Sequence, residues 1–310
     1  MIKLFILDRY DNYYMMYNFF RNTKPSGQLL ALLLLLVAFF VLASGTTALI
    51  IVLHGDAALG IDGKRWLQIL TQVLVFVCPT LLWAALFHDR VGEALLLRFD
   101  FRYWLLAVAG VLCYLLMYPL FDWLTYWNAG WHLPQALQPL EDMWRATSEE
   151  SNRQVKEFVS QPGTGNLMFN LFMMALTPAV CEELFFRGAL QQTLLRWCGN
   201  AHVAILTTAV IFSLAHGDMF GFVPRLAMGI ALGYLFCYGG SVIVNIAAHF
   251  VNNVTVVAAY YLFFSKQIST DPSQPLGFPW WAALAGAAIS VVFFAFFFKL
   301  NCKKPAQKES

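Results

Sequence analysis

Seven polar residues that could do chemistry lie in otherwise apolar segments in the second half of the chain. They are Glu182, Glu183, Arg187, His216, His249, Asn252 and Asn253. A charged group in an apolar environment is costly, so it normally faces a protein interior or a wet cavity and marks function. We therefore expect these residues to form one site between helices.

The spacing of these residues places them on shared helix faces. Three pairs are four positions apart, and such residues lie on one face of a helix; the pairs are Glu183 with Arg187, Phe212 with His216, and His249 with Asn253. Glu182 lies about 100° around the helix from Glu183, so the two carboxylates need not share an environment. One carboxylate can pair with Arg187 while the other stays free for proton chemistry, which is typical of an acid/base site.

Each feature alone is more typical of structure than of function. A single His in an apolar helix is usually hydrogen-bonded in the core, and a Glu–Arg pair is often a structural ion pair. A structural pair accounts for neither histidine, so the combination favours a functional site. The sequence contains no HExxH, GxGD or GxSG motif, so the metalloprotease, aspartyl and rhomboid types of intramembrane protease are unsupported.

Three ordered motifs resemble those of the CPBP family, which comprises CAAX proteases and bacteriocin-processing enzymes and is also called Abi. Residues Cys181–Gly188 match its EExxxR signature, Phe212–His216 match its FxxxH motif, and His249–Asn253 match its HxxxN motif. The resemblance extends over roughly residues 166–264. The ordered trio is much more specific than the EExxxR signature alone.

This resemblance implies a glutamate-dependent intramembrane endopeptidase, similar to CAAX prenyl protease 2, with a core of eight helices. It implies that Glu182 is the general base that activates a water and that His216 helps to hold this water. His249 and Asn253 would stabilise the oxyanion. The residues that would shape the site are Glu183, Arg187 and Phe212, with Arg187 as an ion-pair partner.

A metal remains an alternative, because Glu182, His216 and His249 make a two-histidine, one-carboxylate set that suits zinc. We favour a site without a metal or another cofactor. Asn253 lies one turn from His249, and this pair suits an oxyanion better than it suits a metal ion.

The composition indicates which elements position this site. The chain has 310 residues, 59% of them hydrophobic and 12% charged, with a net charge of +2 and a mean hydropathy of +0.61. Soluble domains carry about a quarter charged residues, so we expect an integral membrane protein. The small net charge and the absence of a basic stripe argue against nucleic-acid binding.

A helix needs about 20 apolar residues to cross a bilayer. We expect an all-α bundle of about eight transmembrane helices, with seven as the alternative: Leu29–Leu53, Trp66–Phe87, Tyr103–Leu124, Leu167–Trp197, Ala201–Ala215, Phe222–Tyr238, Ser241–Phe264 and Trp280–Phe298. Leu167–Trp197 is long and should tilt or kink at Pro178, which removes a backbone hydrogen bond. Ala201–Ala215 is short enough to be a broken or partly embedded helix.

The chain divides into an interfacial segment, residues 1–27, a helix bundle, residues 28–298, and a basic tail, residues 299–310. Lys and Arg residues are concentrated in both end segments and in the loop that holds Arg90, Arg98 and Arg102. The positive-inside rule therefore predicts that both termini are cytoplasmic. We expect a multi-pass protein of a bacterial inner membrane.

One long polar loop, Asn128–Gly165, contains the charged segment Leu140–Val159. We expect a solvated helix over the membrane surface, acting as a connector or as a lid or partner surface. The six cysteines lie mostly in apolar runs without CxxC spacing, so we interpret them as core residues and not as a disulfide or zinc framework.

Three hypotheses of function follow. The first is an endopeptidase in the lipid bilayer that cleaves a membrane-associated peptide or protein. The second is a non-catalytic bacteriocin immunity or partner-binding protein on the same fold. The third, a proton-coupled transporter, is less favoured because the sequence shows no internal repeat and its polar groups are confined to three helices.

Overall fold

The computed structural model describes residues 20–301, and these residues form helices and connecting loops without any strand. Apolar side chains cover much of the outer surface: Leu34, Val41 and Val52 are 62%, 64% and 80% exposed. A helix that leaves its apolar side chains outside is suited to lipid and not to water. The prediction of a polytopic helical bundle is confirmed. Most of the expected interfacial segment, residues 1–19, lies outside the described residues.

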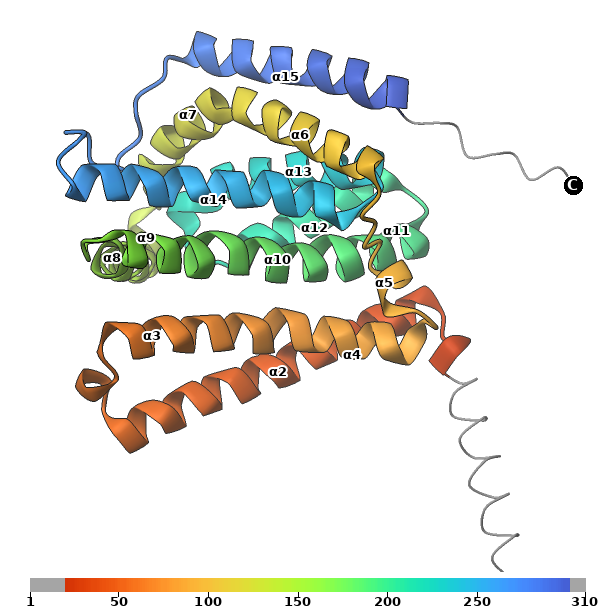
Figure 1. The fold of residues 1–310 in the computed structure, drawn as a ribbon, viewed down its shortest axis with the longest axis horizontal. Coiled ribbons are helices and arrows are strands. Elements are labelled where there is room, and N and C mark those ends of the chain that lie inside the picture. Colours follow the sequence, from red (N-terminus) through yellow and green to blue (C-terminus); the bar gives the residue numbers. More distant parts are fainter. Residues whose placement is uncertain (1–19, 302–310) are drawn as a thin grey trace, which may run out of the picture.

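The first two passes form a pair of helices on one side of the bundle (Figure 1, orange). Helix α2, Pro25–His54, begins with Pro25, whose fixed φ suits a first helical position, and ends at Gly55 with a φ of 78°. The chain returns as one apolar span, Ala58–Phe87. The elements of this return are α3 (Asp56–Gln72), the π-helical turn η1 (Val73–Val77) and α4 (Cys78–Phe87).

The third pass is broken, which corrects the expected continuous helix Tyr103–Leu124. Helix α6, Phe101–Leu116, and helix α7, Tyr118–Ala129, meet at a bend of 44°. Pro119 lies in the first turn of α7 and lacks the N–H that would continue the hydrogen-bond pattern across the junction. The short helix α5, Val91–Ala94, precedes this pair.

Helix α8, Gln138–Val159, lies across one end of the bundle and confirms the predicted helix in the long polar loop. It follows the 3-10 turn η2, Gln135–Leu137. Its charged side chains are mostly exposed, but Glu141 is only 2% exposed. Glu141 accepts hydrogen bonds from the backbone N–H of Leu133 at 2.6 Å and from Arg145 at 2.9 Å.

The helix that carries the paired glutamates is one 35-residue span, Thr164–Cys198. Pro178 follows a π-helical turn. The wider turn makes room for the proline ring at the point where proline has no N–H to donate to the preceding turn. The span consists of α9 (Thr164–Asn170), η3 (Leu171–Leu176), α10 (Thr177–Glu183), η4 (Leu184–Gln191) and α11 (Gln192–Cys198).

The remaining helices complete the bundle. They are α12 (Ala201–Leu214), the 3-10 turn η5 (Met219–Gly221), α13 (Phe222–Gly239), α14 (Val242–Phe264) and α15 (Trp280–Asn301). Helices α12 and α13 pack closely because Gly229 has no side chain: a Cβ there would lie 3.0 Å from the Cβ of Ala209 and 3.1 Å from its Cα. The small-residue spacing Gly229-xxx-Gly233 is therefore a helix contact.

The eight predicted segments are all helical, but they differ in how they satisfy the criteria for a membrane span. Among the described residues, five helices are long and apolar enough alone, and the bent α6–α7 pair makes a sixth. Two apolar helices are shorter, Ala201–Leu214 and Trp280–Phe296. Successive passes alternate in direction, so α5 and α11 lie at one end of the bundle and α8 and α9 at the other (Figure 1).

Candidate active site within the bundle

The centre of the site is a buried ion pair that also binds an imidazole. Arg187 donates from Nη1 to Oε1 of Glu183 at 2.9 Å, and both side chains are fully buried. The Nδ1 atom of His249 lies 2.9 Å from the same oxygen. An ionised carboxylate can only accept hydrogen bonds, so we assign the proton of the neutral imidazole to Nδ1. This assignment leaves Nε2 of His249 as an acceptor.

Glu182 lies on the other side of the same imidazole. Its Oε2 atom is 4.0 Å from Nε2 of His249 and has no hydrogen-bond partner in the protein. The residue is 9% exposed, in contrast to the fully buried Glu183. The two adjacent glutamates thus occupy different environments: one is fixed by an ion pair and the other has an uncommitted oxygen.

Phe212 packs the three motifs against one another. Its ring is fully buried and lies 5.0 Å from the guanidinium carbon of Arg187. The ring of His216 is 5.0 Å away and that of His249 is 6.2 Å away, both nearly perpendicular to it. This aromatic contact therefore fixes the mutual positions of the motifs on η4, α12 and α14.

His216 follows the end of α12 and is oriented by the helix itself. Its Nδ1 atom lies 2.9 Å from the backbone oxygen of Phe212, which can only accept, so Nε2 is left free. The imidazole lies within electrostatic range of Glu182 and His249. His216 is thus directed by one hydrogen bond and keeps one nitrogen available to a ligand or a water.

Asn253 lies one turn beyond His249 on α14, but its amide does not touch either glutamate. Its Nδ2 atom is 3.5 Å from the oxygen of Ala175, which is the limit for a hydrogen bond. Its Oδ1 atom accepts from Asn252 at 3.1 Å. The amide N–H groups of Asn253 are therefore only weakly committed within the protein.

Polar side chains of η4 hold helix α13 in place beside the site. Arg187 donates to the backbone oxygen of Gly229 at 3.2 Å, and Gln191 donates to that of Gly233 at 3.0 Å. In the π-helical turn these two residues are four apart and reach two successive turns of α13. Because Gly229 and Gly233 have no side chains, α12 can pack closely against α13 and the two donors can reach the backbone oxygens of α13.

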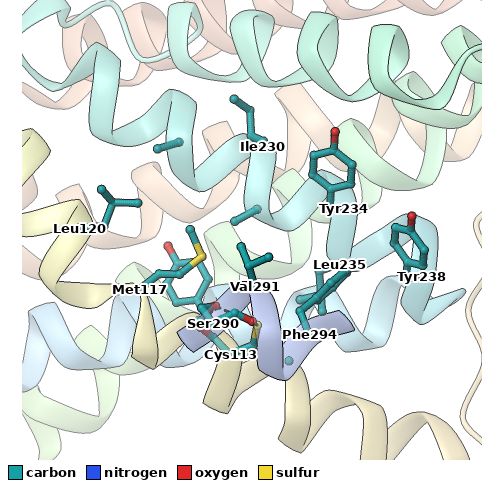
Figure 2. A pocket seen from close by; sticks show the side chains of 14 residues that line it. Cys113, Met117, Leu120, Ile230, Tyr234, Leu235, Tyr238, Ser290, Val291 and Phe294 are labelled. Carbon is teal, nitrogen blue, oxygen red and sulfur yellow. Dashed lines mark hydrogen bonds between the residues drawn. The ribbon is translucent and has the colours of Figure 1, made fainter. Parts of the chain in front are cut away.

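Two cavities lie beside the site. A polar cavity of about 420 Å³ extends between α7, α8, α13, α14 and the loop before α15, and Asn252 and Arg225 are among its lining residues. An apolar cavity of about 510 Å³ lies between α6, α13 and α15. Figure 2 shows Met117, Leu235 and Phe294 around this apolar cavity. Tyr114 lines both cavities.

Sequence reasoning did not select Tyr114, and it gave Asn252 no separate role. Tyr114 is 5% exposed, and its hydroxyl has no hydrogen-bond partner in the protein. The charges of Glu183 and Arg187 both act on this hydroxyl. No motif or spacing points to Tyr114. Asn252 is one of the seven polar residues named from the sequence, and it lies three residues from His249 on the same face of α14.

The zinc set considered from the sequence does not assemble in this structure. Among residues 20–301, no group of three or more His, Cys, Asp and Glu side chains is arranged to hold a metal ion. Five cysteines are described, and all are free. Chemistry without a metal remains a prediction.

Comparison with known proteins supports the same interpretation. Residues 164–255 match the family model of type II CAAX prenyl endopeptidases, described as Rce1-like. This stretch is less than half of the chain, contains all three motifs, and confirms the resemblance to CAAX proteases. No curated protein and no solved structure matches the chain. At the level of the family, the match supports a membrane-embedded endopeptidase of the CAAX protease type.

Proposed function

We propose that this protein is a glutamate-dependent intramembrane endopeptidase in which Glu182 activates the attacking water. The observation that carries the proposal is the free Oε2 atom of Glu182, 4.0 Å from the acceptor nitrogen of His249. Two acceptors at this separation suit a water molecule that donates one hydrogen bond to each. His216, whose Nε2 is free, would provide a third contact to this water.

The reaction then proceeds by proton transfers through Glu182. The water oxygen attacks the peptide carbonyl carbon while Glu182 accepts a water proton, which gives a tetrahedral intermediate with a negatively charged oxygen. Glu182 returns the proton to the amide nitrogen as the C–N bond breaks, so the products are a carboxylic acid and an amine, which then exchange a proton to become a carboxylate and an ammonium group. A positioned general base of this kind accelerates a reaction by about 10² to 10⁴ fold.

His249 and Asn253 would stabilise the oxyanion. For this role Nε2 of His249 must hold a proton as well as Nδ1; this second proton comes from solvent, and Nε2 then donates a hydrogen bond to the oxyanion. The amide of Asn253 would contribute a second donor, because its present contact with Ala175 is long and easily exchanged. Donors held in a water-poor cavity are worth more than the same donors in water.

The substrate that we propose is a membrane-associated peptide or protein. The apolar cavity beside the site supports this proposal, since it can receive the apolar anchor of a substrate while the peptide occupies the polar cavity. Tyr114 borders both cavities and so lies where the anchor would join the peptide.

A survey of peptide termini in membrane fractions tests this function. Cells that express the wild type or Glu182→Gln at matched levels are compared, and thermal unfolding of both purified proteins serves as the control for folding. Termini that appear with the wild type and vanish with the variant support proteolysis and identify the substrate. Identical sets of termini would contradict it and would favour a non-catalytic immunity or partner-binding protein.

A further inference from the structure

His216 lies just outside a regular helix. Helix α12 ends at Leu214, and residues 215–218 form the loop that leads into the 3-10 turn η5. Within this loop Gly217 has a φ of 65°, which glycine adopts without strain. The contact of Nδ1 with Phe212 orients the imidazole ring, but the backbone of His216 is placed by the loop as well as by α12.

Two local contacts join this loop to the start of α13. Ser213 donates from its hydroxyl to the backbone oxygen of Phe222 at 2.6 Å. Arg225 donates from Nη2 to a carboxylate oxygen of Asp218 at 2.6 Å and to its backbone oxygen at the same distance. The charge of Arg225 also acts on the imidazole of His216. The end of α12, the loop and the first turn of α13 therefore form one unit that contains His216.

Asn128 of α7 holds this unit from outside. Its side chain is fully buried, and Nδ2 donates to the backbone oxygen of Met219 in η5 at 3.2 Å. Its Oδ1 atom accepts the backbone N–H of Val223 at 2.9 Å. This N–H lies in the first turn of α13, where backbone N–H groups have no partner within the helix. One side chain from another helix thus binds η5 and caps α13.

The break in the third pass brings Asn128 to this position. The chain bends by 44° between α6 and α7, with Pro119 in the first turn of α7 (Figure 1). Helix α7 then packs against η5 and α13. At 1.5 Å per residue, a straight continuation of α6 would displace residue 128 by on the order of 10 Å. The bend is therefore needed for the contact with η5.

Helix α8 makes a second contact with η5, at the surface. The guanidinium carbon of Arg145 lies 4.0 Å from the centre of the Phe220 ring, and the Arg145 side chain is 36% exposed. A contact of this kind is weakened by water. The two hydrogen bonds of the buried Asn128 side chain are shielded from water and hold the loop more firmly.

We infer that Asn128 is a positioning residue of the reaction. It fixes η5 and the first turn of α13, and through them it keeps His216 where Nε2 can bind the attacking water. This inference rests on the proposed function, which gives His216 its contact with the water. Both hydrogen-bond partners of Asn128 are backbone groups, so its effect on the reaction passes through His216.

The position of His216 can be measured without cleavage, by nitrogen-15 NMR of the full-length protein labelled at histidine. His216→Ala and His249→Ala assign the signals. In Asn128→Ala the signals of His216 should shift, because the loop is released. The signals of His249 should stay in place, since Glu183 holds that ring independently.

Asn170→Ala is the matched control for this measurement. Asn170 is also a buried asparagine, on α9, and it donates to the backbone oxygen of Phe158 at 2.9 Å. Its loss should leave the signals of both histidines unchanged. Unchanged signals of His216 in a folded Asn128→Ala protein would overturn the inference. Equal shifts of His216 and His249, or equal shifts in the two variants, would overturn it as well.

Asn128→Asp keeps the test decisive if Asn128→Ala does not fold. The aspartate has the same size and can still accept the N–H of Val223, but it cannot donate to the oxygen of Met219. The signals of His216 should shift in this variant too, by a smaller amount. Unchanged signals of His216 in Asn128→Asp would overturn the inference.

Kinetics distinguish positioning of His216 from a general structural role. With a peptide from the terminus survey, Asn128→Ala should lower kcat by about ten fold and leave KM nearly unchanged. In a His216→Ala protein the same substitution should lower kcat by less than about two fold, since two residues that act through one contact are not additive. An equal loss in both backgrounds would overturn the inference.

The failure of this inference is distinguishable from the failure of the proposed function. If no termini depend on Glu182, the proposed peptidase function is overturned, and the NMR signals still report whether Asn128 places His216. If such termini are found but His216 does not respond to Asn128→Ala, the peptidase function stands and the positioning role is overturned.

Discussion

His249 binds Glu183 through Nδ1 at 2.9 Å, and the oxygen that it binds is also the one that accepts from Arg187. The shared oxygen holds the imidazole of His249 in one orientation. In the proposed mechanism the two adjacent glutamates have separate tasks: Glu183 orients His249, and Glu182 exchanges protons with the water. The charge of Arg187 makes the carboxylate of Glu183 a stable partner in a fully buried position.

The double role of Glu183 can be separated by two variants. Glu183→Gln should lower cleavage by about 10² fold or more, as expected when the partner that orients a catalytic imidazole is lost. It should also lower the free energy of unfolding by about 3 kcal/mol, because Arg187 is left buried without its counter-charge. Cleavage rate and thermal unfolding are the measurements.

The double variant Glu183→Gln/Arg187→Met removes both charges and should recover much of the stability, since neutral pairs are well tolerated at such sites. Its cleavage should stay as low as that of the single variant. Recovery of cleavage together with stability would mean that Glu183 serves only as the ion-pair partner of Arg187.

The close packing of α12 and α13 predicts a strong position effect for glycine substitutions. In Gly229→Ala the new Cβ would lie 3.1 Å from a backbone atom of Ala209, so the helices must separate. We expect a loss of about 1–3 kcal/mol in the free energy of unfolding, from overpacking. Gly45→Ala is the matched control, because nothing lies within 4 Å of its Cβ.

Gly45→Ala should leave stability unchanged or raise it by up to about 1 kcal/mol, through helix propensity. Thermal unfolding of both variants in the same detergent measures this difference in stability. Equal stability of the two variants would contradict the packing described for Gly229.

The anchoring of α8 should depend on pH through Glu141, which lies outside the membrane-spanning segments. The backbone N–H of Leu133 and the side chain of Arg145 lower the pKa of Glu141 from 4.5 to about 2. A folded-state pKa below the unfolded value means that this stabilisation is complete above about pH 5 and is lost as the pH falls toward 2. Hydrogen exchange in residues 138–159 should therefore become faster over this range.

Glu141→Gln provides the control for this pH dependence. It should exchange faster than the wild type at neutral pH and should lose most of the change between pH 5 and 2. A variant with the same pH profile as the wild type would show that another group anchors α8.

Metal removal distinguishes the two chemistries that the sequence allowed. We expect a chelator to leave the cleavage rate unchanged and elemental analysis of the active protein to find no stoichiometric zinc. Loss of cleavage that zinc restores would contradict this expectation. It would assign the chemistry to a metal-bound water.

The sequence predicted the parts of this site that depend on local helix geometry. The pairing of Arg187 with a glutamate follows from a spacing of four residues, and the helix across residues 138–159 follows from the charge pattern of the loop. The hydrogen bond between Glu183 and His249 could not be predicted from the sequence, because it joins residues 66 positions apart and depends on how α10 and α14 pack. The same is true of Tyr114, whose position between two cavities depends on the packing of α6 against α13.

The break in the third pass shows a further limit of patterns based on hydropathy. Apolar residues continue without interruption from α6 into α7, so the average hydropathy indicates one helix. Pro119 and the bend of 44° divide it in two. The bend sets α7 beside the polar cavity, where Asp122 fixes the loop before α15.

One comparison of cleavage rates tests whether Glu182 is the base that activates water. A peptide identified by the terminus survey is incubated with the wild type and with Glu182→Gln, both folded in the same lipid vesicles, and the initial cleavage rates are measured. We predict that the rate of Glu182→Gln falls by at least about 10² fold, as expected for the loss of a general base. A rate close to that of the wild type in a folded Glu182→Gln protein would contradict the proposed mechanism.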